Sequence, residues 1–371
     1  MNRRWRSTAW AGLMAVLLAG CGGSPTASGG QGAQGSDAAL NSVLDKVKGL
    51  HGDERADRLA KLARKDGGVV SFYTALTSGL SDSVSKAFHE EYGLKLKVYR
   101  ASGEDLVKRM LEESAAGSPK ADLVETGGSE LVNLHDEGAL APYQPPGRSQ
   151  LVDEALVAKA WTGSRIQVFT PGWNKKLAKQ PPTSWEDLAD DRFNGQLAME
   201  IGNADWHMAL TEYWTEEAGK SPQEVKRLWR DIGGGTRMID GHSTLRELMI
   251  SGEFSTAATL YSYMTEESIA TGAPLAWRPA VSPQIIRIQG AGVAKGAPNP
   301  AGAVLLMDWL LEKDGGQAIF DDADIDPVHQ DLYSLEGETY PVDVFRYAKH
   351  MERFQAAYED VVRLGEEGEG P

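Results

Sequence analysis

Strand-like and helix-like segments alternate along this chain in an order that few folds accommodate. Short apolar runs typical of buried strands occur at residues 69–73, 94–98 and 121–124, and helical apolar spacing separates them at 80–93 and 106–111. This β-α-β-α-β order predicts a parallel sheet with helices on both faces. Ligands of such sheets bind beyond the carboxyl ends of the strands, next to the amino termini of helices.

A second α/β unit is expected to begin near residue 163. Its strands are predicted at 166–169, 196–200, 236–239 and 256–260, followed by a long β-rich run at 284–293. Helices are predicted at about 204–218 and 222–232, from Ser243, at 301–311 and at 344–362. Two such units in one chain indicate two lobes of ordinary domain size.

The amino terminus has the pattern of an export signal. Arg3, Arg4 and Arg6 precede an apolar run that is about half as long as the ~20 residues needed to span a bilayer. The sequence Leu18-Ala19-Gly20-Cys21 resembles the bacterial lipobox. That resemblance implies cleavage of residues 1–20, lipid attachment to Cys21, and tethering to the outer face of the cytoplasmic membrane. The alternative is an ordinary secretory signal that happens to precede a cysteine.

Composition limits the partners of the mature chain. Cys21 is the only cysteine, so no internal disulfide can form. Removing residues 1–20 takes away three arginines and no acid, which changes the formal net charge from −15 to −18. An acidic surface of this kind argues against nucleic acid and anionic membrane surfaces as partners.

Three further segments flank the predicted lobes. Residues 21–37 are nearly all Gly, Ser, Ala, Gln and Thr and are expected to form a lipid-anchored flexible linker. Residues 38–66 show helical apolar spacing and are expected to form an N-terminal helical segment. Residues 366–371 are expected to form an acidic tail.

Four stretches, in this order, resemble the extracellular solute-binding proteins of ABC importers, particularly the ferric-ion-binding branch. They are residues 69–75 (VVSFYTA), 120–124 (KADLV), 182–188 (PTSWEDL) with 193–198 (FNGQLA), and 292–300 (GVAKGAPNP). The match extends from about residue 66 to residue 320. It covers most of the mature chain.

The resemblance implies an α/β fold of the two-lobed periplasmic-binding-protein type (type II), with mostly parallel sheets and a β-strand hinge. Lobe 1 would comprise residues 67–165 and 286–330, and lobe 2 residues 166–285 and 331–365. The resemblance further implies a monomer that captures a small solute or metal ion by closure of the lobes. The solute would then pass to an ABC permease, without a catalytic cofactor and without enzymatic activity.

Candidate ligand contacts in lobe 1 follow the three predicted strands. They are Thr74, Thr77 and Ser78 after the first strand, Ser102 and Gly103 after the second, and Thr126 and Gly127 after the third. Backbone N–H groups and hydroxyls in such loops can hold an oxyanion, and glycines permit close backbone approach. The alternatives are helix capping by Ser78 and a tight turn at the glycines.

Candidate contacts in lobe 2 are Asn203, Trp206, Tyr261 and Tyr263. Asn203 and Trp206 open a helix expected to point toward the cleft, and capping by Asn203 is the alternative. The ferric-ion-binding family places adjacent tyrosines near Tyr261 and Tyr263, and their phenolates ligate iron. A hard trivalent cation favours such oxygen donors.

If the ligand is ferric iron, Tyr261, Tyr263 and Glu125 are the expected metal ligands. Here, however, Ser262 separates the two tyrosines, and the first-lobe ligands of the family do not match. An organic or phosphorylated solute, or a chelated metal, therefore stays open.

Two other classes of function, an exported hydrolase and a structural or adhesive lipoprotein, are less consistent with the sequence. The sequence Gly241-His242-Ser243-Thr244-Leu245 begins like the nucleophile elbow of a hydrolase, but Leu245 stands where glycine is needed. Ser243 fits a helix cap instead. A structural or adhesive surface lipoprotein would need repeats or an exposed interaction stripe, and the sequence indicates neither.

Overall fold

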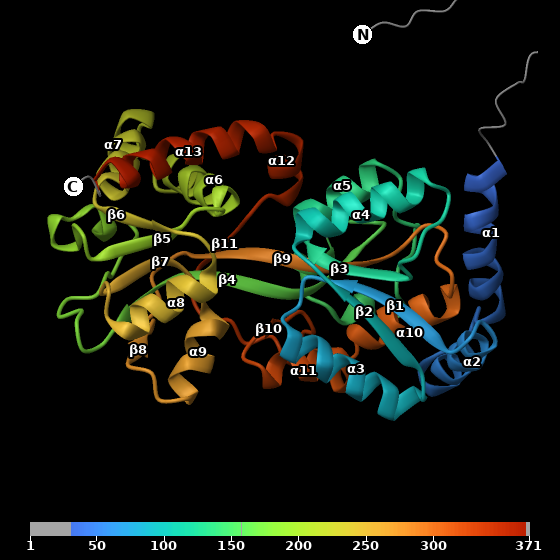
Figure 1. Cartoon of the computed structure of the whole chain (residues 1–371). Helices are drawn as coiled ribbons and strands as arrows, with labels where there is room; N and C mark the ends of the chain where they lie inside the picture. Colours follow the sequence, from blue (N-terminus) through green and yellow to red (C-terminus); the bar gives the residue numbers. More distant parts are fainter. Residues whose placement is uncertain (1–30, 157, 369–371) are drawn as a thin grey trace, which may run out of the picture.

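Two α/β lobes share one curled sheet in the computed structural model of the chain (Figure 1). The structure describes residues 31–156 and 158–368. The predicted signal peptide and Cys21 lie outside these residues. Within them, no helix combines the length and the apolar character needed to cross a membrane.

The sheet runs in the order β2-β1-β3-β9-β4-β7-β5-β6, with β8, β10 and β11 paired at its margins. The strands are β1 (Val69–Thr74), β2 (Lys95–Arg100), β3 (Leu123–Gly127), β4 (Thr162–Asn174), β5 (Leu197–Glu200), β6 (Thr236–Ile239), β7 (Thr256–Tyr261), β8 (Leu275–Ala276), β9 (Gln284–Val293), β10 (Asp326–Pro327) and β11 (Thr339–Pro341). In lobe 1, β1 lies parallel to β2 and β3, and in lobe 2, β5 lies parallel to β6 and β7. The predicted α/β fold with mostly parallel sheets is confirmed.

Helices cover both faces of the sheet in each lobe (Figure 1). Lobe 1 contains α1 (Gln31–Lys46), α2 (Gly52–Lys65), α3 (Ser78–Tyr92), α4 (Gly103–Ala115), α5 (Gly128–Asp136), α10 (Pro300–Leu310) and α11 (Ala318–Asp322). Lobe 2 contains α6 (Ala204–Glu212), α7 (Pro222–Gly234), α8 (His242–Ser251), α9 (Ser262–Ala270) and α13 (Met351–Gly368). Short 3-10 helices occur at Pro146–Gln150, Asp153–Leu156, Glu186–Ala189 and Asp191–Phe193, and single π-helical turns at Tyr213–Glu217 and Lys313–Gln317.

The hinge consists of β4 and β9, which lie antiparallel to each other at the centre of the sheet. β9 also pairs with β3 of lobe 1, and β4 pairs with β7 of lobe 2. Gly290 permits the close approach of β9 to β4, because a Cβ there would lie 2.8 Å from the carbonyl oxygen of Thr162 and 2.7 Å from the Trp161 ring. The two long strands thus carry the connection between the lobes.

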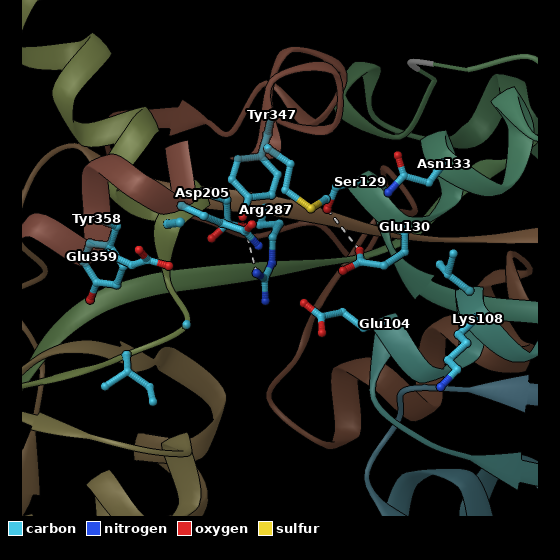
Figure 2. Close-up of a pocket in the computed structure, with 16 residues that line it drawn as sticks. Glu104, Lys108, Ser129, Glu130, Asn133, Asp205, Arg287, Tyr347, Tyr358 and Glu359 are labelled. Atoms are coloured by element: carbon cyan, nitrogen blue, oxygen red, sulfur yellow. Dashed lines mark hydrogen bonds and ion pairs between the residues drawn. The ribbon is translucent and has the colours of Figure 1, made fainter. Parts of the chain in front are cut away.

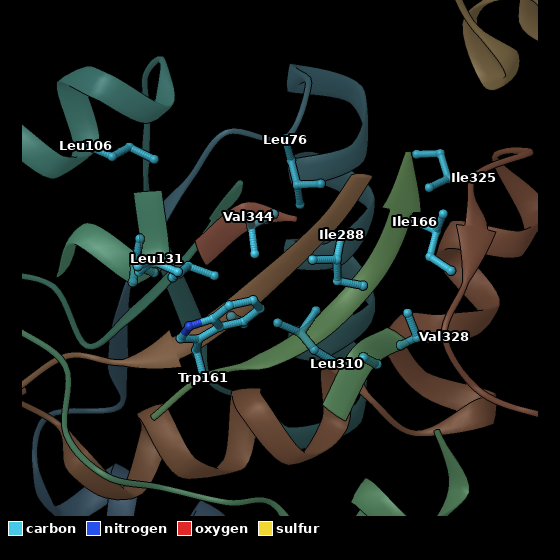
Figure 3. Close-up of a cluster of buried hydrophobic side chains, with 14 of the residues drawn as sticks. Leu76, Leu106, Leu131, Trp161, Ile166, Ile288, Leu310, Ile325, Val328 and Val344 are labelled. Atoms are coloured by element: carbon cyan, nitrogen blue, oxygen red, sulfur yellow. The ribbon is translucent and has the colours of Figure 1, made fainter. Parts of the chain in front are cut away.

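One face of the hinge is apolar and belongs to the main core. Side chains alternate between the faces of a strand, so Ile166, Val168, Ile286 and Ile288 share this face. They belong to one buried cluster with Trp161 and Val344. Figure 3 shows Ile166, Ile288, Trp161 and Val344 of this cluster. Burying this face leaves the opposite face, which carries polar residues, toward the space between the lobes.

The carboxyl-terminal region contacts both lobes. The short helix α12 (Val344–Lys349) packs against α5 of lobe 1, whereas α13 packs against α6 and α7 of lobe 2. Val344 explains the first contact, because it lies so close to Gly128 that a Cβ at Gly128 would be 2.9 Å from its side chain. Residues 331–365, expected wholly in lobe 2, therefore bridge the lobes.

Other element boundaries differ modestly from the sequence expectations. Helix α1 begins at Gln31, inside the linker expected at 21–37, because extending a helix that packs through Leu40 and Val43 requires no new nucleation. Helix α13 likewise continues to Gly368, into the expected acidic tail. The helix expected at 204–218 ends as an α-helix at Glu212 and continues as one π-helical turn.

Candidate ligand-binding cleft

Four polar side chains form the floor of the space between the lobes. Arg165 and Gln167 on β4 lie opposite Gln289 and Arg287 on β9, on the face away from the apolar core. We call these four residues the hinge floor. Gln289 donates to the side-chain oxygen of Gln167 over 3.0 Å. A charged and amide-rich surface therefore lies where the two lobes meet.

Arg287 joins this floor to lobe 2. Its guanidinium donates to Asp205 over 2.7 Å, to Gln167 over 2.6 Å and to the phenol oxygen of Tyr261 over 3.0 Å. The Nε–H of Arg287 is buried and has no partner among the described residues. Asp205 lies in the first turn of α6, so the ion pair fixes the start of that helix against the hinge.

Arg165 joins the floor to lobe 1. It donates to Glu125 over 3.0 Å, and both side chains are buried. The second carboxylate oxygen of Glu125 accepts from the hydroxyl of Thr74 over 2.8 Å. A buried carboxylate is tolerated when it is paired and hydrogen-bonded in this way. Glu125 is therefore already occupied by protein partners.

A cavity of about 540 Å³ lies between the lobes, and Arg287 is the hinge-floor residue that lines it (Figure 2). Its lobe 1 wall consists of Glu104, Val107, Lys108, Ser129, Glu130 and Asn133. Its lobe 2 wall consists of Ile201, Gly202, Ala204, Asp205, Tyr358 and Glu359. Arg287 lies between the walls, and Tyr347, Met351 and Gln355 from the carboxyl-terminal region complete the lining. A cavity of this size accommodates a small solute.

The amino termini of three helices reach this cavity, as parallel strands predict. Helices α4 and α5 follow β2 and β3, and α6 follows β5. Ser102 caps α4 by accepting a hydrogen bond from the backbone N–H of Asp105 over 3.2 Å. The strand ends of the two lobes thus face each other across the cavity.

Tyr261 and Tyr263 lie with their rings nearly parallel, with centroids 6.0 Å apart. Tyr261 ends β7 and Tyr263 lies in the first turn of α9, so the change from strand to helix brings the two rings to one side. His242 also stacks on Tyr261, with ring centroids 4.0 Å apart. Burial raises the pKa of both phenols above the usual value, although Arg287 partly opposes this for Tyr261. Both tyrosines are therefore neutral at pH 7.

The remaining predicted contacts lie at or near the starts of helices. Thr77 and Ser78 begin α3 and are exposed, and Asn203 precedes α6 with its amide 3.2 Å from Nε2 of His242. Trp206 is fully buried between Trp185 and Trp229 and does not reach the cavity. None of the predicted contact residues lines the 540 Å³ cavity, but Gly103, Gly127 and Asn203 each lie within two residues of one that does.

Sequence reasoning missed the residues that line the cavity, Arg287 above all. One signal was available: Arg287 is the only charged residue in the otherwise apolar and polar run from Gln284 to Val293. A lone charge in a buried strand calls for a partner or a ligand. Asp205, Glu104 and Glu130 carried no comparable signal, because acidic residues are common in the first turn of any helix.

The described residues contain no group of three or more His, Cys, Asp and Glu side chains placed to hold a metal ion. Of the expected ferric ligands, Glu125 is paired with Arg165, and the Tyr261 phenol oxygen accepts from Arg287. The donor set therefore fits a protein-bound cation less well than it fits a solute with several polar groups.

Comparison with known proteins agrees with this fold. Iron uptake protein A1 of Synechocystis is 21% identical over 260 residues, which cover 66% of this chain and 71% of that protein. The substrate-binding protein of an ABC transporter from Agrobacterium tumefaciens aligns with a TM-score of 0.67 at 14% identity, over 79% of this chain and 94% of that one. AfuA from Actinobacillus pleuropneumoniae, solved with fructose-6-phosphate, aligns with a TM-score of 0.65 at 16% identity, over 80% of this chain and 98% of AfuA.

The model of one protein family matches residues 83–337, which is more than half of the chain. That family is described as bacterial extracellular solute-binding protein. The predicted resemblance is thereby confirmed, and the chain belongs to the bacterial extracellular solute-binding protein family.

Proposed function

We propose that this protein is the substrate-binding component of an ABC import system and holds a small polar solute between its lobes. The observation that carries the proposal is the cavity that both lobes line around Arg287. The family and the fold are those of transport proteins that bind solutes. The protein is proposed to act as a monomer that presents its loaded form to a membrane permease.

Binding in this proposal works by closure of the hinge. A solute that touches both walls has its full set of contacts only in the closed form, so it shifts the equilibrium toward that form. Changing an open-to-closed ratio from 99:1 to 1:99 requires about 10⁴-fold tighter binding to the closed form. Contacts to Glu104 or Glu130 from lobe 1 and to Asp205 or Tyr358 from lobe 2 can supply this difference.

The solute is proposed to be organic and polar rather than bare ferric iron. Iron would require Glu125 to leave Arg165 and Tyr261 to ionise beside its stacked neighbours. A polar organic molecule needs neither change. It can use the backbone and side chains at the starts of α4, α5 and α6 directly.

Ferric iron is the second candidate, favoured by the parallel tyrosine pair and by the similarity to an iron uptake protein. If phenolates bound ferric iron, the loaded protein would have a visible charge-transfer colour that Tyr261→Phe shifts or abolishes. A colourless protein after ferric loading would exclude this candidate.

The test of the main proposal uses protein purified from its own cells. Native mass spectrometry should find a carried small molecule. Small-angle scattering should show a smaller radius of gyration with this solute than after its removal. A radius of gyration that does not respond to any bound solute would contradict the closure mechanism.

Export and lipid anchoring through Cys21 remain part of the proposal. In cells, Cys21→Ala should move the protein from the membrane fraction to the soluble fraction. Retention of the variant in the membrane fraction would contradict lipid anchoring.

The hydrolase alternative has little support at its expected nucleophile. Ser243 lies in the first turn of α8 and is exposed. The neighbouring His242 stacks on Tyr261 and contacts Asn203, and burial together with Arg287 lowers its pKa to about 3. A histidine held in this way is poorly placed to activate Ser243.

A further inference from the structure

The cavity between the lobes has more acidic than basic side chains. Glu104, Glu130, Asp205 and Glu359 line it, against Lys108 and Arg287. Asp205 is neutralised by Arg287 at 2.7 Å. Among residues 31–156 and 158–368, no basic side-chain nitrogen lies within 4.0 Å of the carboxylate of Glu104, Glu130 or Glu359. The cavity therefore carries an uncompensated negative charge.

The acidic residues occupy the places where an anion would otherwise bind. Glu104, Glu130 and Asp205 lie in the first turns of α4, α5 and α6, the helices whose amino termini reach the cavity. Helix amino termini attract anions. Among the helices that do not reach the cavity, α3, α8 and α9 have no acidic residue in the first turn, whereas α2 and α7 do. An anionic solute in the cavity would have to displace the carboxylates of the protein.

A second polar group lies behind the lobe 1 wall, outside the lining of the cavity. The hydroxyl of Thr126 is fully buried and has no hydrogen-bond partner among the described residues. A Cβ placed on Gly103 would lie 3.0 Å from this hydroxyl and 2.9 Å from Cγ of Glu130. Thr126 and Glu130 thus converge beside Gly103, where a hydroxyl without a partner lies next to a carboxylate that accepts from the Ser129 hydroxyl over 3.0 Å and has no basic partner in the described part of the chain.

The opposite wall offers a surface for carbon chains. Ile201 is one of the few large apolar side chains that stay exposed, and it lies at the lobe 2 side of the cavity. Tyr347 and Met351 add further apolar surface between the walls. The cavity therefore combines carboxylates on both walls with apolar surface at Ile201, Tyr347 and Met351.

We propose that the cleft selects a solute with a protonated amine on a short carbon chain, with the amine held by Glu104 and Glu130. This inference rests on the proposed function. Closure brings these carboxylates toward Asp205 and Glu359, and like charges oppose that approach. A bound ammonium group removes the repulsion, so it favours the closed form in particular.

The test compares solutes of equal chain length with different end groups. Calorimetric titration uses 1,4-diaminobutane, 4-aminobutanoate, 1,4-butanediol and butanedioate, and repeats the set with chains of two to six carbons. The amines are expected to bind at least tenfold more tightly than the diols and dicarboxylates of the same length. Tighter binding of dicarboxylates, or the absence of binding by every amine in the series, overturns the proposal.

Matched variants test whether Glu104 and Glu130 bind the amine. Glu104→Gln and Glu130→Gln should each weaken binding of the best amine at least tenfold. Glu112→Gln, on the same helix as Glu104 but away from the cavity, should change it less than twofold. Thermal unfolding of each variant checks that the fold is intact. Equal effects of Glu104→Gln and Glu112→Gln would contradict the assignment.

The experiments distinguish a wrong solute class from a wrong proposed function. If a dicarboxylate or a diol binds and reduces the radius of gyration, the solute class is wrong and the solute-binding function stands. If protein from its own cells carries no solute and no compound in the series changes the scattering, the proposed function fails as well.

Discussion

At the residue scale, Arg287 connects more of the candidate site than any other side chain described above. Its three hydrogen-bond partners, Asp205, Gln167 and Tyr261, come from three different elements. A buried ion pair loses much of its Coulomb energy to desolvation, so such a pair is weak support for stability. We infer that Arg287 and Asp205 are kept to hold the start of α6 at the hinge.

Removing Arg287 should destabilise the folded state, because Asp205 would stay buried without a partner. Arg287→Gln is expected to lower the free energy of unfolding by about 3–5 kcal/mol. Chemical denaturation measures this change. In the double variant Arg287→Gln/Asp205→Asn, most of the loss should be recovered, since the unpaired charge is gone.

A surface arginine provides the control for this pair. Arg192 contacts Asp187 at 3.3 Å in a partly exposed position, and Arg192→Gln should cost less than about 1 kcal/mol. If Arg287→Gln were as mild as Arg192→Gln, the described role of Arg287 would be wrong.

The sequence located the loops of the site but not its side chains. Parallel strands place their carboxyl ends at one edge, so Gly103, Gly127 and Asn203 could be expected near the cleft. The partners of Arg287 could not, because Asp205 is 82 residues away and Gln167 is 120 residues away. Contacts over such distances follow from strand register, which local patterns do not specify.

At the element scale, Asn299 ties the start of α10 to two neighbouring segments. Its side-chain oxygen accepts from the backbone N–H of Gly302 over 2.9 Å. Its amide donates to the carbonyl oxygens of Ala63 and Val69, each over 3.1 Å. A single buried side chain thus caps α10 and fixes the end of α2 beside β1.

Asn299→Ala should therefore destabilise the protein more than the loss of an ordinary helix cap does. The free energy of unfolding is expected to fall by about 3 kcal/mol, because the cap and two further hydrogen bonds of a buried side chain are lost, at about 1 kcal/mol each. Ser221→Ala removes the exposed cap of α7 and should cost only about 1 kcal/mol. Equal losses in the two variants would contradict the bridging role of Asn299.

Most elements could be predicted from local patterns, and the exceptions have a physical cause. The alternation of β1 to β3 with α3 and α4 follows directly from apolar spacing. The antiparallel insertion of β9 between β3 and β4 does not, since an apolar run predicts a buried strand but neither its neighbours nor its direction. The course of α12 toward lobe 1 likewise depends on Val344 fitting beside Gly128, a contact between distant segments.

At the scale of the whole molecule, buried carboxylates make stability depend on pH. Burial raises the pKa of Asp122 and of Asp326 to about 6, above the usual 3.8. Asp122 is 1% exposed and accepts hydrogen bonds from the backbone N–H groups of Ser71 and Asn299 over 2.7 and 2.5 Å. The two hydrogen bonds do not fully compensate for the hydration that the carboxylate loses on burial, so the folded state favours the protonated acid.

The sign of the pH dependence follows from this shift. Above pH 6 both acids are charged in the folded state, and the charged form of Asp122 costs about 3 kcal/mol relative to the unfolded chain. This cost is lost as the pH falls through 6 toward 4. Stability should therefore increase from pH 7.5 to pH 5, as urea denaturation at each pH can measure.

The variant Asp122→Asn isolates the contribution of this residue. It should reduce the pH dependence between 7.5 and 5 and leave the part that comes from Asp326, whatever its effect on stability at any one pH. An unchanged slope would assign the pH dependence to other groups, such as the overall repulsion within a chain of net charge −15.

The position of β9 also affects synthesis of the chain. Until residue 293 has been made, β3 and β4 are open strand edges with no common neighbour, and the two half-sheets have no link but the covalent chain. Bare edges of this kind pair readily with other molecules. A fragment that stops before Gln284 therefore contains most of both lobes and is prone to aggregate.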